Sequence, residues 1–366
     1  MKRRKLLFFA TEDWFVRSHF LPLLRRANAD GFEVVVAARD SGALKGESNI
    51  RVIGTSFARR AIFPWELSRQ VAELDAVLAR ERPDLVHAIA LKPIALLLNA
   101  RAQSFARVLA LTGRGYLMSD NSLFKRVVRA RLRAMLRRAL TADNTLLLVE
   151  NEHDAHWAHA RPSKFLLMPG AGVDPDAFLP AAEPAGPIVV GIVARLIKSK
   201  GIDIAVRAVT ELRARGLDLS LRVGGSADPE NPEHYGDDEI ARWRETPGVQ
   251  VVGRVNDVAA FWQDTHIACL PSRGGEGLPR TLLEAAACAR PIVTTDAPGC
   301  AEFAQDIGMV APRGDSRMLA RALETLASDA AMRARMGALA RQKVIDGFTE
   351  AHAAAVASKA WARLLS

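Results

Sequence analysis

The sequence predicts an α/β protein built from two doubly wound domains that face a cleft. Short, uninterrupted apolar runs of strand length recur along the chain, and segments with helical periodicity separate them. Such runs are typical of parallel strands buried between two layers of helices, as in Rossmann-like folds. The same alternation occurs in both halves of the 366-residue chain, whose length favours two domains.

The first half supplies the strands of the predicted N-terminal domain. We expect strands at 6–10, 32–38, 50–56, 84–90, 107–112 and 145–150, with helices around 18–30 and near 65–81. The chain starts with basic residues, but the apolar run "LLFFA" ends before Glu12. This run is too short for a signal peptide or a membrane span, so it predicts a buried first strand.

The second half repeats the pattern. Its expected strands are "KFLLMPG", "PIVVGIVAR", "LSLRVGG", "VQVVGR", "IACLPS", "PIVTTD" and "GMVAP". The stretch 172–187 is rich in Pro, Gly and Asp and predicts a linker. We therefore expect an N-terminal domain over 1–170, a C-terminal domain over 171–350, and a C-terminal helix over 351–366 that crosses back to the first domain.

The net charge and the cysteine pattern indicate which partners and which redox environment to expect. A formal net charge of +9 favours a polyanionic partner such as nucleic acid, a phosphorylated ligand or an anionic membrane. Nucleic acid is not expected, because the basic stretches lack interleaved aromatic residues. The three cysteines show no Cys-x-x-Cys spacing, which indicates neither a disulfide framework nor a zinc site and fits a reducing cytoplasm.

The segment "GIVARLIKSKG" places cations after a predicted strand. Arg195, Lys198 and Lys200 lie in a short loop, Gly201 turns the chain, and a helix is expected to follow. Cationic side chains beside a helix N-terminus suit a diphosphate, because both supply charge-assisted hydrogen bonds. A solvated basic loop is the alternative interpretation.

Two glutamates eight positions apart frame a glycine-rich loop. Glu276 lies in "RGGEGLP", where a carboxylate can accept hydrogen bonds from sugar hydroxyls. Glu284 lies about two turns into the following helix, on an otherwise apolar stripe, so it requires hydrogen-bond donors. A ribose diol supplies two donors. The alternative partner is Arg280, four residues earlier.

These motifs together resemble the family 4 retaining glycosyltransferases of GT-B fold. The matching set is "RLIKSKG", "VGRVNDV" and "PSRGGEGLPRTLLEAAACARPIVTTDAPGCAE", which covers most of the second half. The resemblance implies that Arg195, Lys200 and Glu276 form the catalytic group, with the two cations on the donor diphosphate and Glu276 on the transferred sugar. It also implies a set of donor-binding residues in the C-terminal domain: Gly275, Gly277, Leu278, Glu284 on the ribose, and Arg254 beside the nucleobase.

The first half is similar to one branch of that family. The stretches "TEDWFVRSHFLPLLRRA" and "ALTGRGYLMSDNSLFKRVVRARLRAMLRRAL" resemble enzymes that extend polyprenyl-diphosphate-linked sugars in polysaccharide, capsule or O-antigen assembly. The glycine-rich first loop of many members is replaced by "TEDWFVRSH", and "LALTGRG" stands where a Phe-His-Thr-type site often occurs. The acceptor-side candidates are Asp13, Arg17, His19, His87, Thr112 and Gly113. A structural histidine is the alternative for each of the two histidines.

Residues 123–140 contain seven basic residues and no acidic one. Val128, Leu132, Met135 and Leu136 recur at helical spacing, with Phe124 one turn before Val128. Two compatible interpretations remain open. The stripe packs on the core with solvated arginines, or the helix lies on an anionic bilayer or cradles a lipid diphosphate. The acidic stretch 227–239 favours a solvated loop over a metal site, and no metal site is expected.

The expected activity is the transfer of a sugar from a nucleotide-diphospho-sugar, most simply a UDP-sugar, to a lipid-linked or other saccharide acceptor. The resemblance implies retention of configuration, and we expect a metal-independent reaction with no cofactor besides the nucleotide-sugar co-substrate. We expect a cytoplasmic protein, peripheral at the inner face of the cytoplasmic membrane. The alternatives are a 2-epimerase on the same fold and a non-catalytic, sugar-nucleotide-binding assembly subunit.

Overall fold

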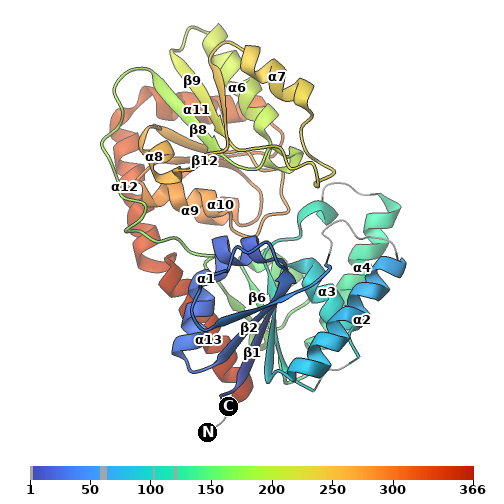
Figure 1. The fold of residues 1–366 in the computed structure, drawn as a ribbon. Helices are drawn as coiled ribbons and strands as arrows, with labels where there is room; N and C mark the ends of the chain where they lie inside the picture. The colour runs from blue at the N-terminus through green and yellow to red at the C-terminus, as the bar shows by residue number, and fades with distance from the viewer. Residues whose placement is uncertain (1–2, 58–63, 102–103, 119–121) are drawn as a thin grey trace. The chain divides into compact units, whose positions relative to one another are not determined.

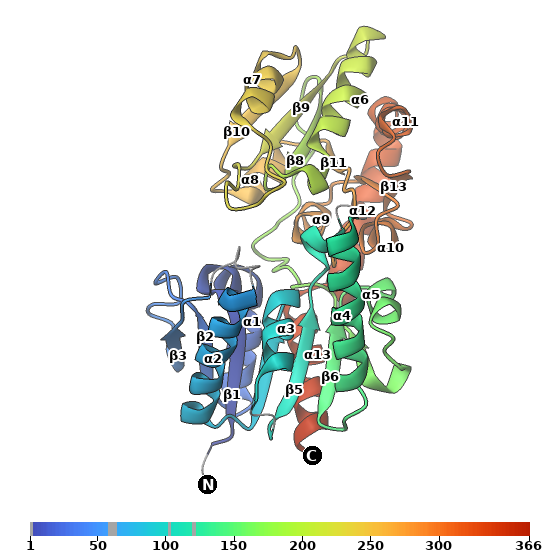
Figure 2. The ribbon, with the colours of Figure 1, turned by 90° about the vertical axis from the view of Figure 1, so that its right-hand side faces the viewer.

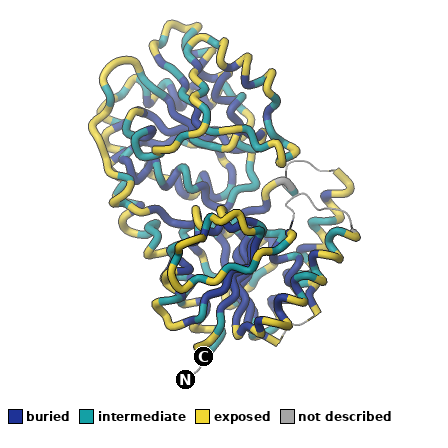
Figure 3. Tube along the Cα trace, in the orientation of Figure 1, coloured by how far each residue is buried: buried dark blue, intermediate teal, exposed yellow. Residues whose placement is uncertain are grey.

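The computed structural model describes residues 3–57, 64–101, 104–118 and 122–366 (Figure 1). The chain forms two compact units. Unit 1 comprises residues 1–171 together with 350–366, and unit 2 comprises residues 172–349. In each unit the strands are largely buried and the exposed residues lie mainly on loops and outer helix faces (Figure 3).

Unit 1 contains a parallel sheet of seven strands in its described residues, in the order β3-β2-β1-β4-β5-β6-β7. The strands are β1 (Lys5–Glu12), β2 (Glu33–Arg39), β3 (Ile50–Gly54), β4 (Leu85–Ile89), β5 (Ala106–Leu111), β6 (Thr145–Val149) and β7 (Phe165–Leu167). The helices are α1 (Asp13–Ala29), α2 (Pro64–Glu81), α3 (Leu91–Asn99), α4 (Leu123–Ala139), α5 (Glu152–Trp157) and α13 (Glu350–Leu365), with short 3-10 turns η1 (Gly115–Met118) and η2 (Pro162–Lys164).

Two apolar cores cover the faces of this sheet. On one face, α1 and α13 pack against alternate strand residues, with Phe8, Phe20 and Trp361 among the buried side chains. On the other, α2, α3 and α4 pack against the intervening residues, such as Phe9 (Figure 2). The C-terminal helix therefore belongs to unit 1, as the sequence predicted.

Unit 2 contains a second parallel sheet, in the order β10-β9-β8-β11-β12-β13. Its strands are β8 (Ile188–Val193), β9 (Leu219–Gly224), β10 (Val249–Gly253), β11 (Ile267–Leu270), β12 (Ile292–Thr295) and β13 (Gly308–Ala311). Helices α6 (Ile202–Ala214), α7 (Asp237–Glu245) and α11 (Ser316–Ser328) cover one face. Helices α8 (Val258–Gln263), α9 (Arg280–Ala287), α10 (Cys300–Ala304) and α12 (Ala330–Gly347) cover the other, and a 3-10 turn η3 (Lys198–Lys200) precedes α6.

Both sheets reverse their strand order once, between β1 and β4 in unit 1 and between β8 and β11 in unit 2. Ligands of open α/β sheets bind at such a switch point, beyond the carboxyl ends of the strands. The predicted fold class, two doubly wound Rossmann-like domains, is confirmed.

Three details differ from the sequence-based expectation. Helix α1 begins at Asp13 rather than near residue 18, because its buried stripe against the sheet already starts at Val16. The run 165–167, expected among the strands of the second half, pairs with β6 and is the edge strand of unit 1. The stretch 172–187 is anchored along unit 2, where Arg333 holds Glu183 at 2.8 Å.

Candidate donor site in unit 2

The loop after β8 carries the predicted cations and is held against the loop after β11. Gly201 has a left-handed backbone with φ of 69°, and a Cβ there would collide with the carbonyl oxygen of Pro271. Only glycine allows this approach. Because β8 and β11 are neighbours at the switch point, the loop with Lys200 and the glycine-rich loop meet where a ligand is expected.

The glycine-rich loop places Glu276 on Lys200. Gly274 and Gly275 adopt φ of 113° and 83°, which turns the chain back toward the β8 loop. The Lys200 Nζ atom lies 2.6 Å from Glu276 Oε1, and the two side chains are only 13% and 16% exposed. Two residues predicted independently, from different motifs, therefore form one cation–carboxylate pair at the switch point.

Arg195 is held by a residue that the sequence did not single out. Its Nη1 atom lies 2.9 Å from Asp228 Oδ2, and its side chain is half exposed. Asp228 belongs to a segment that pairs with the β8 loop through its backbone: Leu196 N donates to Ser226 O at 3.0 Å, and Lys198 N donates to Glu233 O at 2.8 Å. This segment of the acidic stretch 227–239 keeps exposed residues, such as Glu230, but its backbone is fixed to the β8 loop. Its polar composition does not reveal the backbone pairing.

Glu284 lies in the second turn of α9 with 13% of its side chain exposed. Arg280 Nε donates to its Oε1 at 3.0 Å, so the alternative partner identified from the spacing is present. Burial raises the pKa of Glu284, and the Arg280 charge opposes this shift. Glu284 is thus a largely buried carboxylate with a cationic neighbour rather than a surface residue.

The remaining predicted donor residues lie on two loops. Gly275, Gly277 and Leu278 share the β11–α9 loop with Glu276, and Leu278 is buried. The start of α10 supports this loop, because a Cβ on Gly299 would collide with the Gly277 carbonyl oxygen. Arg254 follows β10, the edge strand, and is exposed.

In this arrangement the two cations each pair with a carboxylate, Arg195 with Asp228 and Lys200 with Glu276. Helix α6 begins directly after the loop that carries them. The loop therefore offers a phosphorylated ligand two exchangeable cations beside a helix N-terminus, which is the combination that binds phosphate groups well.

The predicted acceptor-side residues of unit 1 lie in different surroundings, some of them buried in the core. Asp13 is fully buried and accepts hydrogen bonds from Ser41 Oγ at 2.6 Å and Ala43 N at 2.9 Å. Burial favours a higher pKa for Asp13, but these hydrogen bonds outweigh it and lower the pKa. Arg17 Nη1 donates to Ala43 O at 2.5 Å. Asp13 and Arg17 thus fix the same loop, and an acceptor-binding role for Asp13 is wrong because it exposes no atom.

The two histidines lie in different surroundings. His19 is half-buried on α1 beside Phe15, and its Nδ1 atom lies 2.7 Å from Ser18 Oγ. His87 lies inside β4 and is fully buried, stacked on Phe8, and its Nδ1 accepts a hydrogen bond from Trp361 Nε1 at 3.1 Å. The proposed acceptor-side role of His87 is therefore wrong. It is a core residue that connects the sheet to α13.

His87 should make the protein sensitive to acid. Burial lowers its pKa to about 3, whereas the unfolded chain binds this proton near pH 6.5. Below pH 6.5 the unfolded state therefore binds more protons, and the free energy of unfolding falls by up to about 1.4 kcal/mol per pH unit. In urea unfolding between pH 7 and pH 5, His87→Phe should show a shallower pH dependence than the wild type. The half-buried control His19→Phe should keep the wild-type slope, and equal slopes for all three proteins would contradict this assignment.

Thr112 and Gly113 follow β5 at the carboxyl edge of the unit 1 sheet. The next residue, Arg114, was missed from the sequence. It is buried and forms an ion pair with Asp154, Nε to Oδ1, at 2.7 Å. The guanidinium groups of Arg114 and Arg133 each lie 5.6 Å from the Trp157 ring centroid. A cationic cluster therefore adjoins the predicted Thr112–Gly113 turn.

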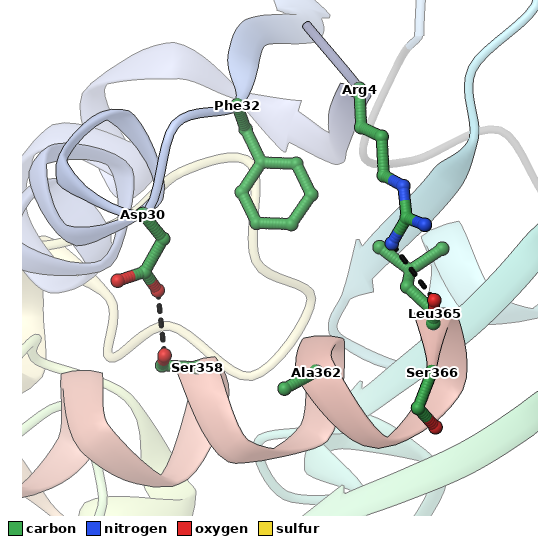
Figure 4. A pocket seen from close by; sticks show the side chains of 7 residues that line it. All are labelled: Arg4, Asp30, Phe32, Ser358, Ala362, Leu365 and Ser366. Atoms are coloured by element: carbon green, nitrogen blue, oxygen red, sulfur yellow. Dashed lines mark hydrogen bonds between the residues drawn. The ribbon is translucent and has the colours of Figure 1, made fainter.

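A cavity of about 440 Å³ lies elsewhere in unit 1 (Figure 4). It is lined by Arg4, Asp30, Phe32, Ser358, Ala362, Leu365 and Ser366. Its polar groups bind one another, Arg4 Nη1 to Leu365 O at 2.8 Å and Ser358 Oγ to Asp30 at 2.6 Å. Because Arg4 precedes β1, the cavity lies at the amino end of that strand, opposite the edge where α/β proteins bind their ligands.

The described residues contain neither a candidate metal site nor a candidate membrane-spanning helix. In the parts of the chain that the structure describes, no three His, Cys, Asp or Glu side chains are arranged to hold a metal ion. Within those same ranges, no helix has both the length and the apolar character needed to cross a membrane.

Two family models match this chain. A model described as glycosyl transferase 4-like matches residues 5–149, and one described as glycosyl transferases group 1 matches residues 187–329. The chain belongs to the family 4 glycosyltransferases of GT-B fold. The second match contains both loops of the candidate donor site, with the Lys200–Glu276 pair and Glu284.

Two curated relatives agree with this membership. The capsular polysaccharide biosynthesis glycosyltransferase CapM of Staphylococcus aureus is 26% identical over 163 residues, 44% of this chain and 42% of CapM. The amylovoran biosynthesis glycosyltransferase AmsK of Erwinia amylovora is 28% identical over 224 residues, 58% of this chain and 54% of AmsK. These matches span only about half the length of either relative.

The fold is shared with solved structures. Sucrose-phosphate synthase from Thermosynechococcus elongatus matches with a TM-score of 0.83 at 17% identity, over 99% of both chains. HepE of Anabaena, solved in complex with UDP-glucose, matches with a TM-score of 0.74 at 17% identity, over 98% of this chain and 99% of HepE. At this identity the likeness shows the fold alone.

Proposed function

We propose that this protein is a retaining glycosyltransferase that moves a sugar from a nucleotide-diphospho-sugar to a saccharide acceptor. The observation that carries the proposal is the contact between Lys200 and Glu276 at the switch point of unit 2. It places a cation suited to a diphosphate beside a carboxylate suited to sugar hydroxyls. The donor bond that breaks joins these two parts of the substrate.

In the proposed reaction, Lys200 and Arg195 stabilise the negative charge that develops on the leaving diphosphate. Glu276 orients the sugar through its hydroxyls. The acceptor oxygen bonds to the anomeric carbon as the carbon–phosphate oxygen bond breaks, on the face that the diphosphate leaves. The electron pair departs with the diphosphate, whose phosphate oxygen takes the acceptor proton. Because two side chains neutralise the charge, activity should persist in a metal chelator.

A UDP-sugar is the proposed donor. HepE, which was solved with UDP-glucose bound, shares the fold over almost the whole chain. In this proposal the ribose hydroxyls donate to Glu284, and Arg254 lies beside the base. The test is release of UDP from a panel of UDP-sugars, followed by an NMR assignment of the product's anomeric configuration.

The proposed acceptor is a polyprenyl-diphosphate-linked saccharide, in line with the polysaccharide-assembly names of CapM and AmsK. The arginines around the Thr112–Gly113 turn support a diphosphate cradle. Burial lowers the pKa of Arg114, its partner Asp154 raises it, and the nearby charges of Arg133 and Arg129 lower it further. Three guanidinium groups thus lie close together beside this turn, an arrangement that suits an anionic acceptor group.

We also propose that α4 rests on an anionic membrane, which makes the enzyme peripheral at the inner face of the cytoplasmic membrane. Leu132 and Leu136 are buried against the unit 1 core, whereas Leu123, Phe124 and Val127 are 75%, 62% and 59% exposed. Phe124 therefore does not continue the inward stripe, contrary to the sequence-based expectation. The later turns of α4 thus pack on the core, whereas its first turns expose apolar side chains among arginines. Exposed apolar side chains among basic residues are typical of a helix that lies in the plane of a membrane surface.

The double variant Leu123→Ser/Phe124→Ser should reduce binding to phosphatidylglycerol vesicles by about tenfold or more, because two exposed apolar side chains no longer enter the bilayer interface. Co-sedimentation measures the bound fraction. The control is Leu339→Ser in unit 2, whose leucine is 48% exposed on α12 and should have no effect. Equal binding of wild type and double variant would refute the membrane role of α4.

A further inference from the structure

Arg273 contacts three segments that build the donor site. Its Nη1 and Nη2 atoms donate to the two carboxylate oxygens of Asp203, at 2.8 and 2.7 Å, in the first turn of α6. Nη1 also donates to Lys198 O at 2.6 Å and lies 3.4 Å from Tyr235 Oη. The backbone N of Arg273 donates to Ser199 O at 2.7 Å. One residue therefore joins the cation loop, α6 and the segment 226–235.

Asp203 and Arg273 stabilise each other in their charged forms. Burial favours a neutral Asp203, but hydrogen bonds from Arg273 and from Tyr235 Oη, at 2.5 Å, outweigh it and lower the pKa of Asp203. The hydrogen bonds to Asp203 raise the pKa of Arg273 against its own burial. An ionised carboxylate thus holds the guanidinium in a bidentate geometry, which determines its orientation as well as its position.

We propose that Arg273 is a positioning residue that sets the placement of Lys200 relative to Glu276 and thereby the affinity for the donor diphosphate. The inference rests on the proposed function of the site. Lys200 directly follows two residues that Arg273 binds and precedes Gly201, which is locked on Pro271. Glu276 lies three residues after Arg273. Both members of the Lys200–Glu276 pair therefore depend on one side chain.

The guanidinium acts through Lys200 rather than on the ligand itself, since its contacts are with Asp203, the Lys198 carbonyl and Tyr235. Without the guanidinium, the 198–200 turn should move more freely relative to the glycine-rich loop, and Lys200 relative to Glu276. Small displacements of catalytic groups have large effects on binding and rate, because electrostatic contacts and hydrogen bonds depend steeply on distance.

The first test is a double-variant cycle on UDP affinity by calorimetry. Arg273→Met should weaken UDP binding by about tenfold. Lys200→Ala/Arg273→Met should bind UDP no more than about twofold more weakly than Lys200→Ala, because Arg273 acts through Lys200. Wild-type UDP affinity in Arg273→Met would overturn the inference. A tenfold loss that recurs in the Lys200→Ala background would also overturn it.

Unit 2 offers a matched control for stability. Arg333 also holds a carboxylate through two atoms, Glu183 at 2.8 Å for both bonds, and donates to the carbonyl oxygens of Leu326 and Ala327. Arg333→Met should lower the melting temperature about as much as Arg273→Met and leave UDP affinity unchanged. An equal loss of UDP affinity in Arg333→Met would reduce Arg273 to a structural role.

A second measurement separates this inference from the proposed function. The rate at which an amine-reactive acyl reagent modifies Lys200, followed by peptide mass spectrometry, requires no nucleotide. It should rise several-fold in Arg273→Met and not in Arg333→Met. A rise in a protein that binds no nucleotide would refute the proposed function and leave the positioning role supported. An unchanged rate would overturn the positioning role even in an active enzyme.

Discussion

Lys200→Ala should lower the rate of donor cleavage by about 100- to 1,000-fold. Charge develops on the leaving diphosphate as the sugar–oxygen bond breaks, and removing one preorganised partner of such a charge has an effect of this size. Lys200 suits this role because its side chain is only 13% exposed and lies 2.6 Å from Glu276. Steady-state release of UDP measures the effect.

The matched control is Lys198→Ala, which removes an exposed lysine from the same 3-10 turn. Its rate should stay within about threefold of the wild type, because Lys198 contacts the donor-site loops through its backbone: its N donates to Glu233 O, and its carbonyl oxygen accepts from Arg273. A Lys200→Ala enzyme that keeps wild-type activity, with an intact thermal transition, would contradict the assignment of Lys200 to the diphosphate.

Substitution of Glu276 and of Glu284 should have different effects on the affinity for UDP and for the UDP-sugar. Glu284→Ala should weaken the binding of both ligands by about 10- to 100-fold, because it removes the largely buried carboxylate that we propose accepts hydrogen bonds from two ribose hydroxyls. Glu276→Ala should weaken only the UDP-sugar. It should not weaken the binding of free UDP, because it removes only the carboxylate that pairs with Lys200 and leaves the lysine in place.

Calorimetric titration of both variants with UDP and with the accepted UDP-sugar measures this difference. Similar losses of UDP affinity in Glu276→Ala and Glu284→Ala would contradict the division of the pair into a sugar contact and a ribose contact. If both variants bound the UDP-sugar as tightly as the wild type, the donor would have to bind away from the β11–α9 loop.

The fold was predictable because its strands are continuous apolar runs that have few alternatives to burial in a parallel sheet. The run 165–167 shows where this reasoning stops. Its composition predicts a strand, but the identity of its partner, β6 rather than a strand of unit 2, depends on tertiary contacts. The early start of α1 was missed because Glu12, Asp13 and Arg17 interrupt the apolar pattern, so the sequence alone does not reveal that Val16 is buried.

The proximity of Lys200 and Glu276 was predictable from local motifs, since each residue follows a strand that ends at the switch point. The supporting residues of the site were not. Asp228 and Arg273 act through contacts across 33 and 70 positions of sequence, for which a single chain gives no signal. For His87 the prediction was wrong in the other direction, because it assigned a ligand-binding role to a core residue. The sequence alone does not distinguish a strand histidine that is buried beside Trp361 from one that is exposed to a ligand.

The most direct test of the proposed activity is UDP release from a panel of UDP-sugars, with and without a crude extract of polyprenyl-diphosphate-linked sugars, beside an Arg195→Ala control. We predict release from one donor, increased by the extract and lost in the control. Measurable UDP binding with no release from any UDP-sugar, GDP-sugar or ADP-sugar would contradict the proposed activity and favour a sugar-nucleotide-binding subunit without catalysis.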